Sequence, residues 1–558
     1  MTQKIGVSIK RTRAKMLSSI PERYMRLGSL MLLGTVASVL TLVAPNHARA
    51  MSLYSGTIDD QDLEVNLETT IQYSVFERVN APSKVLAGPE NANGNLGDLA
   101  LSHGIVDNTI EVLPVFDLKY GSFGAHVSGE AYLDTPYLQN GQNGVHFSSS
   151  TRNINGQNAL LLDAFVYGGV NFGANDDQSF TLKVGRQTLL WGQSLFFFNN
   201  GIAAGQAPVN LREAQSNPNA EAQQLFMPIG QVVATYQPNN TYTLQAYYQF
   251  EWQHYFYNGA GSYFSEFHQQ AATGQQLFLG DAFPGGPPLY FYHVKDLRPP
   301  VNNGQFGASL QATFGIYDVG IYALRWDSKL PEVYSGSPNI QSTPRAPINA
   351  GSYWLVYPRD IQTYGASVST NIGAANVAAE VSTRRNMPLA AAGLSRPPAY
   401  PGSANAGALY PVGNTLAAQV SAIYVSGALP LVPSGISFAG EVAMNHLISV
   451  TANRAALATG RQATAAAFQF VLTPQYDSVL PNLDVSFPIG LTYDFLGRSE
   501  IDTTMNHGTG NVTFGISGTY RTTWIGSLTY VNYLGKPDPT LNPIADRGYV
   551  GLNIQHTF

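Results

Sequence analysis

The residues of this sequence that could support catalysis are few and scattered. None of the 558 positions is a cysteine, so disulfides and cysteine metal sites are excluded. The closest two of the 10 histidines, His254 and His268, stand 14 positions apart. A G-x-S-x-G elbow, an H-E-x-x-H motif and a G-x-x-x-x-G-K-[ST] phosphate loop are absent from the sequence. We therefore predict no enzyme, no cofactor and no metal; a hydrolase with its nucleophile and base on adjacent strands stays open as an alternative.

A stronger group of candidate residues lies in one long connection, residues 191–228. It holds Trp191, the run Phe196–Phe198, and the charged pair Arg212 and Glu213. Three consecutive phenylalanines in an exposed loop are costly, and burying each would recover about 1.5–3 kcal/mol. We expect this connection to fold inward as a constriction or plug. The alternative is a loop that packs over the rim or against its neighbours.

A second aromatic connection, residues 256–300, follows soon after. After Phe256 it contains nine further phenylalanine and tyrosine residues: Tyr257, Tyr263, Phe264, Phe267, Phe278, Phe283, Tyr290, Phe291 and Tyr292. Aromatic side chains in a loop can form an apolar entrance, or they can belong to an aromatic belt and loop core. Both interpretations remain open from the sequence.

The elements that must position these residues are strands with period-two alternation. In Leu63–Val75 and in Tyr549–Phe558, apolar residues occupy every second position and polar residues fall between them. Similar stretches continue along the chain, joined by short and long connections in strict alternation. They count to about 18 strands; the hairpins at 306–326 and 465–495 show the weakest pattern, so 16 strands is the alternative count. The predicted strands are Leu63–Val75, Ile110–Tyr120, Phe123–Leu133, Leu160–Phe172, Phe180–Leu190, Gly230–Tyr236, Tyr242–Tyr255, Phe306–Phe314, Val319–Trp326, Ile361–Ile372, Asn376–Arg384, Ala417–Val425, Ile436–His446, Ala465–Tyr476, Val485–Phe495, Val512–Tyr520, Trp524–Tyr533 and Tyr549–Phe558.

This pattern predicts an all-β fold, a transmembrane antiparallel β-barrel in the bacterial outer membrane. Such barrels show one strand face to lipid and the other to a polar lumen, with short periplasmic turns and longer outer loops. No stretch after residue 50 has 18 uninterrupted apolar residues, so no membrane helix is expected there. A soluble sandwich is the alternative, but it predicts no systematic alternation of short and long connections.

The same phase sorts the charged residues onto the lumen face. It predicts inward positions for Glu68, Glu130, Lys183, Glu251, Arg325, Glu380, Arg384 and Glu441. We expect Glu251, Arg325 and Arg384 to line the wall of a substrate path. The plainer interpretation is a solvated wall without a role in selectivity. Arg186 shares phase with the lipid-facing residues, so it should lie at the rim, or a bulge near Gly185 should reverse the phase.

The first 50 residues resemble a cleaved secretory signal. A basic segment precedes the apolar stretch Leu27–Val43, and Ala48-Arg49-Ala50 fits an A-x-A cleavage site. A membrane anchor is the alternative, although the apolar stretch is short for a span of roughly 20 residues. Removal of residues 1–50 would take away 8 of the 30 basic and 1 of the 36 acidic residues, leaving a net charge of −13. That charge argues against a nucleic-acid partner. The mature domain is therefore expected to be residues 51–558.

Several segments together resemble one family, the proteobacterial outer-membrane family catalogued as domain of unknown function thirteen-oh-two. The segments are Trp191-Gly192-Gln193-Ser194, Pro208–Arg212, Tyr248–Trp252, Tyr357–Gly365 and Asn386–Leu389. The chain departs from the resemblance at Gln193, where an acidic residue is expected, and in Ala203–Gln206. The resemblance implies an outer-membrane barrel over the whole mature chain and passage of hydrophobic molecules. It also implies that the terminal Phe558 is recognised by the barrel-assembly machinery.

These observations lead to a functional expectation. We expect a passive outer-membrane channel for small hydrophobic or aromatic compounds, embedded in the lipid bilayer. Its substrate path would involve Trp191, Phe196, Phe197, Phe198, Arg212, Glu213, Glu251, Arg325 and Arg384. A general porin for hydrophilic solutes, a barrel-embedded hydrolase, and a structural or adhesive surface protein are the alternatives.

Overall fold

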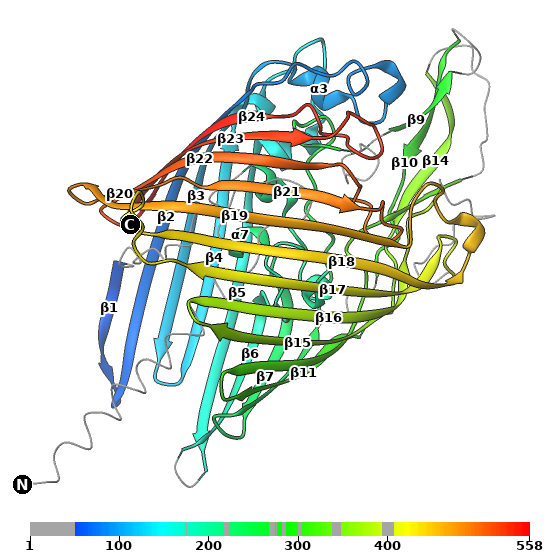
Figure 1. Ribbon diagram of the computed structural model, residues 1–558. Coiled ribbons are helices and arrows are strands. Elements are labelled where there is room, and N and C mark those ends of the chain that lie inside the picture. The colour runs from blue at the N-terminus through cyan, green and yellow to red at the C-terminus, as the bar shows by residue number, and fades with distance from the viewer. Residues whose placement is uncertain are drawn as a thin grey trace, which may run out of the picture.

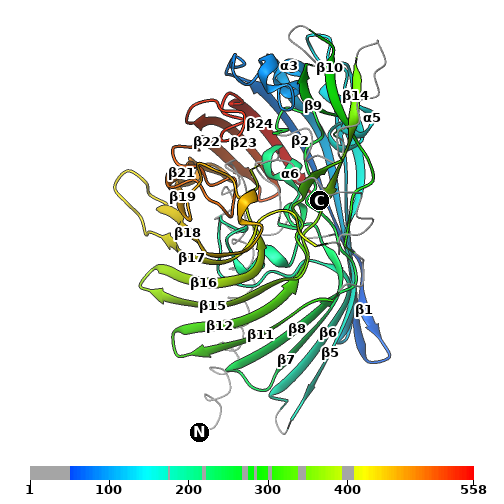
Figure 2. The same ribbon diagram turned by 90° about the vertical axis from the view of Figure 1, so that its right-hand side faces the viewer.

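The computed structural model describes residues 51–173, 176–216, 222–266, 276–281, 286–299, 304–336, 347–392 and 407–558, together with residue 274. The predicted signal, residues 1–50, lies outside the described residues. Strands dominate, and they form one large curved sheet whose wall is seen from two directions in Figures 1 and 2.

The large sheet closes into an antiparallel barrel of 18 strands, as predicted. Closure comes from the pairing of β2 with β24, in which Thr70 faces Thr557 and Arg78 faces Tyr549. One barrel position is shared by two short strands, β20 and β21. In ring order the strands are β2 (Gln61–Arg78), β3 (Gly104–Tyr120), β4 (Phe123–Asp134), β5 (Gln157–Phe172), β6 (Gln178–Gln187), β7 (Ile229–Gln237), β8 (Tyr242–Gln249), β11 (Gln305–Phe314), β12 (Tyr317–Trp326), β15 (Ile361–Ile372), β16 (Ala375–Pro388), β17 (Val412–Val425), β18 (Ile436–Ala452), β19 (Thr464–Leu480), β20 (Leu483–Ser486) with β21 (Ile489–Leu496), β22 (Gly510–Tyr520), β23 (Trp524–Leu534) and β24 (Tyr549–Thr557).

The two faces of the wall differ in chemistry, as the alternation predicts. The outer face carries large exposed apolar side chains: Val127, Leu161, Val166, Val170, Ile321, Val420, Val442, Phe514 and Leu528. The inner face carries polar side chains that other parts of the chain cover: Gln72, Ser74, Glu130, Gln231, Gln249, Gln419, Glu441 and Asn553. A closed barrel leaves no strand edge unpaired, and an apolar outer belt suits only lipid. The protein is therefore a barrel of the bacterial outer membrane.

The helices lie in the connections between strands and form no part of the barrel wall. They are η1 (Pro89–Asn91), α3 (Leu96–Ala100), α4 (Thr135–Leu138), α5 (Ser149–Thr151), the short π-helical turn η2 (Arg152–Gly156), η3 (Ile202–Gly205), α6 (Leu211–Ser216), α7 (Ala222–Leu225) and η4 (Arg454–Ala456). Among the described residues, none of these helices has the length and apolar character needed to cross a membrane.

Two strand groups were not predicted from the sequence. β1 (Met51–Ile58) pairs only with the first residues of β2, so it extends the sheet below the end of β24. A separate four-stranded sheet forms from β9 (Gln276–Asp281), β10 (Pro288–His293), β13 (Glu332–Ser335) and β14 (Ile348–Val356). Figure 1 shows it projecting from the loop end of the barrel. The second aromatic connection thus contributes strands to an extramembrane sheet.

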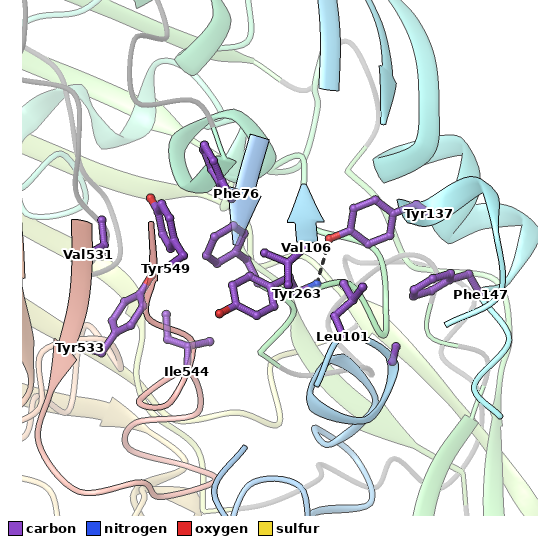
Figure 3. Packing of buried hydrophobic residues seen from close by; sticks show 12 residues of the cluster. Phe76, Leu101, Val106, Tyr137, Phe147, Tyr263, Val531, Tyr533, Ile544 and Tyr549 are labelled. Atoms are coloured by element: carbon purple, nitrogen blue, oxygen red, sulfur yellow. Dashed lines mark hydrogen bonds between the residues drawn. The ribbon is translucent and has the colours of Figure 1, made fainter. Parts of the chain in front are cut away.

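Loops at the outer end are tied together by a buried hydrophobic cluster, here called the cap cluster, which consists of Phe76, Ala100, Leu101, Val106, Tyr137, Phe147, Tyr263, Phe264, Val531, Tyr533, Ile544 and Tyr549. Figure 3 shows Tyr263 among side chains from the first and last strands, including Phe76 and Tyr549, whose rings stack at 4.7 Å. The Tyr263 backbone N–H donates to the hydroxyl of Tyr137 at 3.1 Å. Beside this cluster Asp98 of α3 binds Arg78 at 2.8 Å and Arg547 at 3.4 Å, and all three side chains are fully buried. Four distant parts of the chain meet there.

Candidate functional site

The connection between β6 and β7 enters the barrel, as predicted from its aromatic content. We call residues Trp191–Pro228 the plug. All of its described residues from Asn200 to Ser216 are buried. Figure 2 shows α6, and Figure 1 shows α7, inside the ring of strands. The hydrogen bonds below show that the plug is held by side chains of the barrel wall.

Two glutamates of the wall hold the backbone N–H groups of the plug. Glu380 of β16 accepts from Gln193 and from Ile202, each at 2.6 Å. Glu441 of β18 accepts from three consecutive residues, Leu195, Phe196 and Phe197, through one carboxylate oxygen. Hydrogen bonds to an ionised acceptor are stronger than neutral ones. The predicted inward position of both glutamates is correct, and the structure adds that they anchor the plug.

Two cations hold carbonyl groups of the same segment. Arg384 of β16 donates to Gly201 O at 2.7 Å, and Lys329, just beyond β12, donates to Gly205 O at 2.7 Å. Lys329 was not singled out from the sequence, because a lone lysine after a strand carries no pattern. Acidic side chains thus accept from the backbone N–H groups of the plug, and basic side chains donate to its carbonyl groups.

The aromatic residues of the plug pack in different directions. Trp191 packs against Tyr247 and Tyr322 of the wall, and its indole N–H donates to Gln245 at 2.6 Å. Phe196 is buried, whereas Phe198 packs on Phe226 within the plug, with ring centroids 4.7 Å apart. Phe197 packs against Ala443, Ala465, Ala467 and Met505. The three phenylalanines are therefore covered, but they do not form one cluster.

Arg212 and Glu213 lie on the opposite side of the plug, against β3 and β4. The Arg212 guanidinium contacts Glu213, lies 3.6 Å from Glu130, and covers the ring of Tyr132 at 3.4 Å from its centroid. Gln224 of α7 contacts Glu111 of β3. Sequence reasoning brought Arg212 and Glu213 together with the phenylalanines, but the fold directs them to separate parts of the lumen.

Two predicted wall residues lie elsewhere. Arg325 shares the outward phase of exposed Ile321, between buried Leu324 and Trp326, and it pairs with Asp360 at the rim. The prediction that Arg325 points into the lumen was wrong. The inward positions at the end of β12 are those of Leu324 and Trp326, and the sequence pattern had been assigned with the opposite phase there. Glu251 lies past the end of β8, where it accepts from the Gly230 N–H at 2.7 Å.

Glu251 also pairs with Arg186 at 3.6 Å. The β5–β6 and β6–β7 registers run without a shift through Gly185, so no bulge reverses the phase of Arg186. Arg186 therefore occupies the rim, the first of the two predicted alternatives. Glu251 neutralises this rim arginine and does not line a lumen wall.

A cavity of about 870 Å³ lies between the plug and the outer loops. Phe197, Leu211, Tyr255, Tyr257, Leu389 and Tyr533 supply much of its apolar surface. Polar and charged side chains line the rest of it, and Lys329, Arg384, Arg461, Asp494 and Asp502 are among the charged ones. Of the nine residues predicted for a substrate path, Phe197 and Arg384 reach this cavity. Tyr257 comes from the second aromatic connection, whose composition was the signal for it, whereas Tyr255 is the last residue of the predicted strand Tyr242–Tyr255.

Replacing Glu441 should loosen the plug. Glu441→Ala leaves the N–H groups of buried Phe196 and of half-buried Leu195 and Phe197 without their acceptor, which should cost on the order of 3 kcal/mol. We expect brief openings to appear in single-channel recordings of the purified variant. Glu90→Ala, at an exposed loop position, is the control, and its single-channel recordings should match those of the unaltered protein. Identical recordings from Glu441→Ala and the unaltered protein would show that this anchor is dispensable.

The buried amine of Lys329 should make stability depend on pH. Burial lowers the pKa of Lys329 to about 7, although nearby Asp327 opposes the shift. Between pH 7 and the unfolded pKa of about 10.4, the unfolded chain binds more protons, so stability should rise with pH by up to about 1.4 kcal/mol per unit. Below pH 7 this contribution should be constant. Urea unfolding at pH 7 and pH 9 measures it.

Lys329→Met should remove that pH dependence, whereas Lys84→Met, at an exposed position, should retain it. If the free energy of unfolding depends on pH equally in Lys329→Met and in the unaltered protein, Lys329 is not the source of this dependence.

No curated protein sequence matches the chain. Solved structures of similar shape include OccAB2 of Acinetobacter baumannii, with a TM-score of 0.43 and 10% identity over 88% of this chain and 98% of that one. OpdK of Pseudomonas aeruginosa, solved with vanillate, has a TM-score of 0.41 and 10% identity over 90% of this chain and 100% of that one.

A BenF-like porin from Pseudomonas fluorescens Pf-5 has a TM-score of 0.41 and 10% identity over 90% of this chain and 99% of that one. Structural similarity with such low TM-scores does not indicate what this protein binds. The barrel assignment rests on the strand pairing itself. The family model described as "Protein of unknown function (DUF1302)" matches residues 29–558. The resemblance inferred from the sequence segments is thereby confirmed, and the chain belongs to the DUF1302 family.

Proposed function

We propose that the protein is an outer-membrane channel that admits small hydrophobic or aromatic compounds. The observation that carries this proposal is the cavity above the plug, in which a group of aromatic and aliphatic side chains, among them Phe197, Tyr255 and Tyr257, stands beside polar and charged ones. Binding sites for small organic molecules are concave, and aromatic side chains in them supply contact area while polar groups fix the orientation of the ligand. Passage to the periplasm then requires the plug to shift from its wall anchors.

The plug favours this proposal over a general porin for hydrophilic solutes. Barrels of 16–18 strands can leave an aqueous channel when nothing fills them. Here the buried plug residues and their anchors on Glu380, Glu441, Arg384 and Lys329 occupy that space. A filled lumen supports selective passage with little steady ion flow.

Dye influx into whole cells tests the proposal. N-phenyl-1-naphthylamine, a small apolar aromatic probe that fluoresces on reaching a membrane, should enter several-fold faster in cells that carry the protein than in matched cells without it. Ala391→Trp, which places a bulky ring from a loop into the cavity, should slow this influx. Ala81→Trp, at an exposed position, is the matched control and should leave influx unchanged.

Liposome swelling in arabinose provides the second arm. We expect swelling far slower than that produced by an open porin. Rapid arabinose entry together with unaltered dye influx would establish a general porin and refute the proposal.

A further inference from the structure

A group of buried carboxylates lies where the plug meets the barrel wall. Glu111 comes from β3, Glu130 from β4 and Glu213 from α6 of the plug, and each side chain is at most 3% exposed. One oxygen from each carboxylate lies within 4.8 Å of the others. The three residues are distant in sequence, so the fold alone brings them together.

Positive charge beside this group comes from Arg212. Its guanidinium contacts Glu213, lies 3.6 Å from Glu130, and is held over the ring of Tyr132. This guanidinium is thus shared between a carboxylate of the plug and a carboxylate of the wall. Ionised groups in the interior are costly unless they are paired and hydrogen-bonded. A bound divalent cation would bring two further positive charges to these carboxylates.

Glu130 provides an independent observation. Glu130 is only 2% exposed. No donor among the described residues makes a hydrogen bond to either of its carboxylate oxygens. An ionised carboxylate can accept about four hydrogen bonds. Apart from the ion pair with Arg212, both oxygens of Glu130 are thus available within the cluster.

We propose that Glu111, Glu130 and Glu213 bind a hard divalent cation, Ca²⁺ or Mg²⁺. Both ions prefer oxygen ligands, and Ca²⁺ lies about 2.3–2.6 Å from each ligand, so oxygens on opposite sides of it can be about 5 Å apart. The observed separations fit that limit. Water would complete the coordination shell.

The ion would join the plug to the wall. Glu213 belongs to α6 of the plug, whereas Glu111 and Glu130 belong to neighbouring strands of the barrel. This attachment is remote from the anchors on Glu380 and Glu441, which hold the opposite part of the plug by its backbone. The proposal concerns the structure of the plug and does not depend on what the channel carries.

Thermal unfolding with and without cations tests the site. The full chain is refolded from denaturant, so that no lipopolysaccharide is present, and is stripped with EDTA. Addition of CaCl₂ or MgCl₂ at millimolar concentration should raise Tm saturably, because a ligand that binds only the folded state stabilises it. Terbium luminescence, excited through nearby Tyr132, should report direct binding that Ca²⁺ displaces.

Glu130→Gln and Glu111→Gln should each weaken terbium and Ca²⁺ binding by at least about tenfold and abolish most of the Tm rise. Glu441→Gln is the matched control: it alters a buried glutamate that anchors the plug elsewhere, so it should lower Tm but keep the full cation-dependent rise. Terbium binding to the unaltered protein keeps the proposal testable if a glutamine variant does not fold.

Two results would overturn the proposal. One is a Tm that does not respond to either cation together with no displaceable terbium signal, which would mean that protons and Arg212 neutralise the cluster. The other is a cation-dependent rise of equal size in Glu130→Gln, Glu111→Gln and the unaltered protein, which would place the bound ion elsewhere.

Discussion

Removal of the plug should convert a protein with little steady ion flow into an open pore. Gln187 faces Ile229 across the β6–β7 ladder, so a short Gly-Ser linker can replace residues 191–228 without disturbing either strand. An unfilled 18-stranded barrel leaves an aqueous channel. Conductance across a planar bilayer should therefore increase by more than about tenfold.

The double variant Glu380→Ala, Glu441→Ala provides a second route to the same state. It keeps every plug residue but removes five N–H acceptor contacts, so it should produce frequent large openings without deletion. Equal conductance in the deletion variant and the unaltered protein would show that the plug does not close the lumen. It would also remove the main support for a selective channel.

Replacement of Asp98 should open the outer loops. Asp98→Ala leaves the buried guanidinium groups of Arg78 and Arg547 without their shared carboxylate. Removal of one partner of a buried ion pair costs about 3–5 kcal/mol. Hydrogen–deuterium exchange in peptides covering 96–101 and 544–549 should accelerate by about 100-fold or more, because 1.4 kcal/mol is a factor of ten.

The barrel strands far from these loops serve as an internal reference. Exchange in residues 417–425 should stay unchanged in Asp98→Ala, since the ion pairs do not reach that part of the wall. Glu90→Ala, an exposed change in the same loop as Asp98, should leave exchange in both peptides unaltered. Slow exchange in all peptides of Asp98→Ala would mean that the hydrophobic contacts of the cap cluster hold the loops without the ion pairs.

The barrel and its strand count could be predicted because a membrane strand imposes a requirement on every residue. Each outward position must suit lipid, and each inward position must suit a polar interior, so the period of two persists through whole strands. Stretches such as Ile361–Ile372 and Trp524–Leu534 therefore appear in the structure close to their predicted bounds. The aromatic content of residues 191–228 likewise predicted that this connection needed covering.

The same rule failed where strands end. Arg325 and Glu251 lie at the outer rim, where neither lipid nor the lumen imposes a face, and both were assigned to the wall. β1 and the small sheet formed by β9, β10, β13 and β14 stand outside the barrel ring, so the strict alternation of short and long connections gave no place for them.

The sequence by itself determined the outer-membrane barrel, its family and the inward course of the plug, because these follow from local periodicity and composition. Only the tertiary structure decided which side chains meet. Glu441 reaches the backbone of Phe196, and Arg212 reaches Glu130, across large separations along the chain. Barrel closure and the path of the plug decide which of these residues meet. The local sequence around each glutamate shows the same strand alternation, so it does not indicate the distant partner.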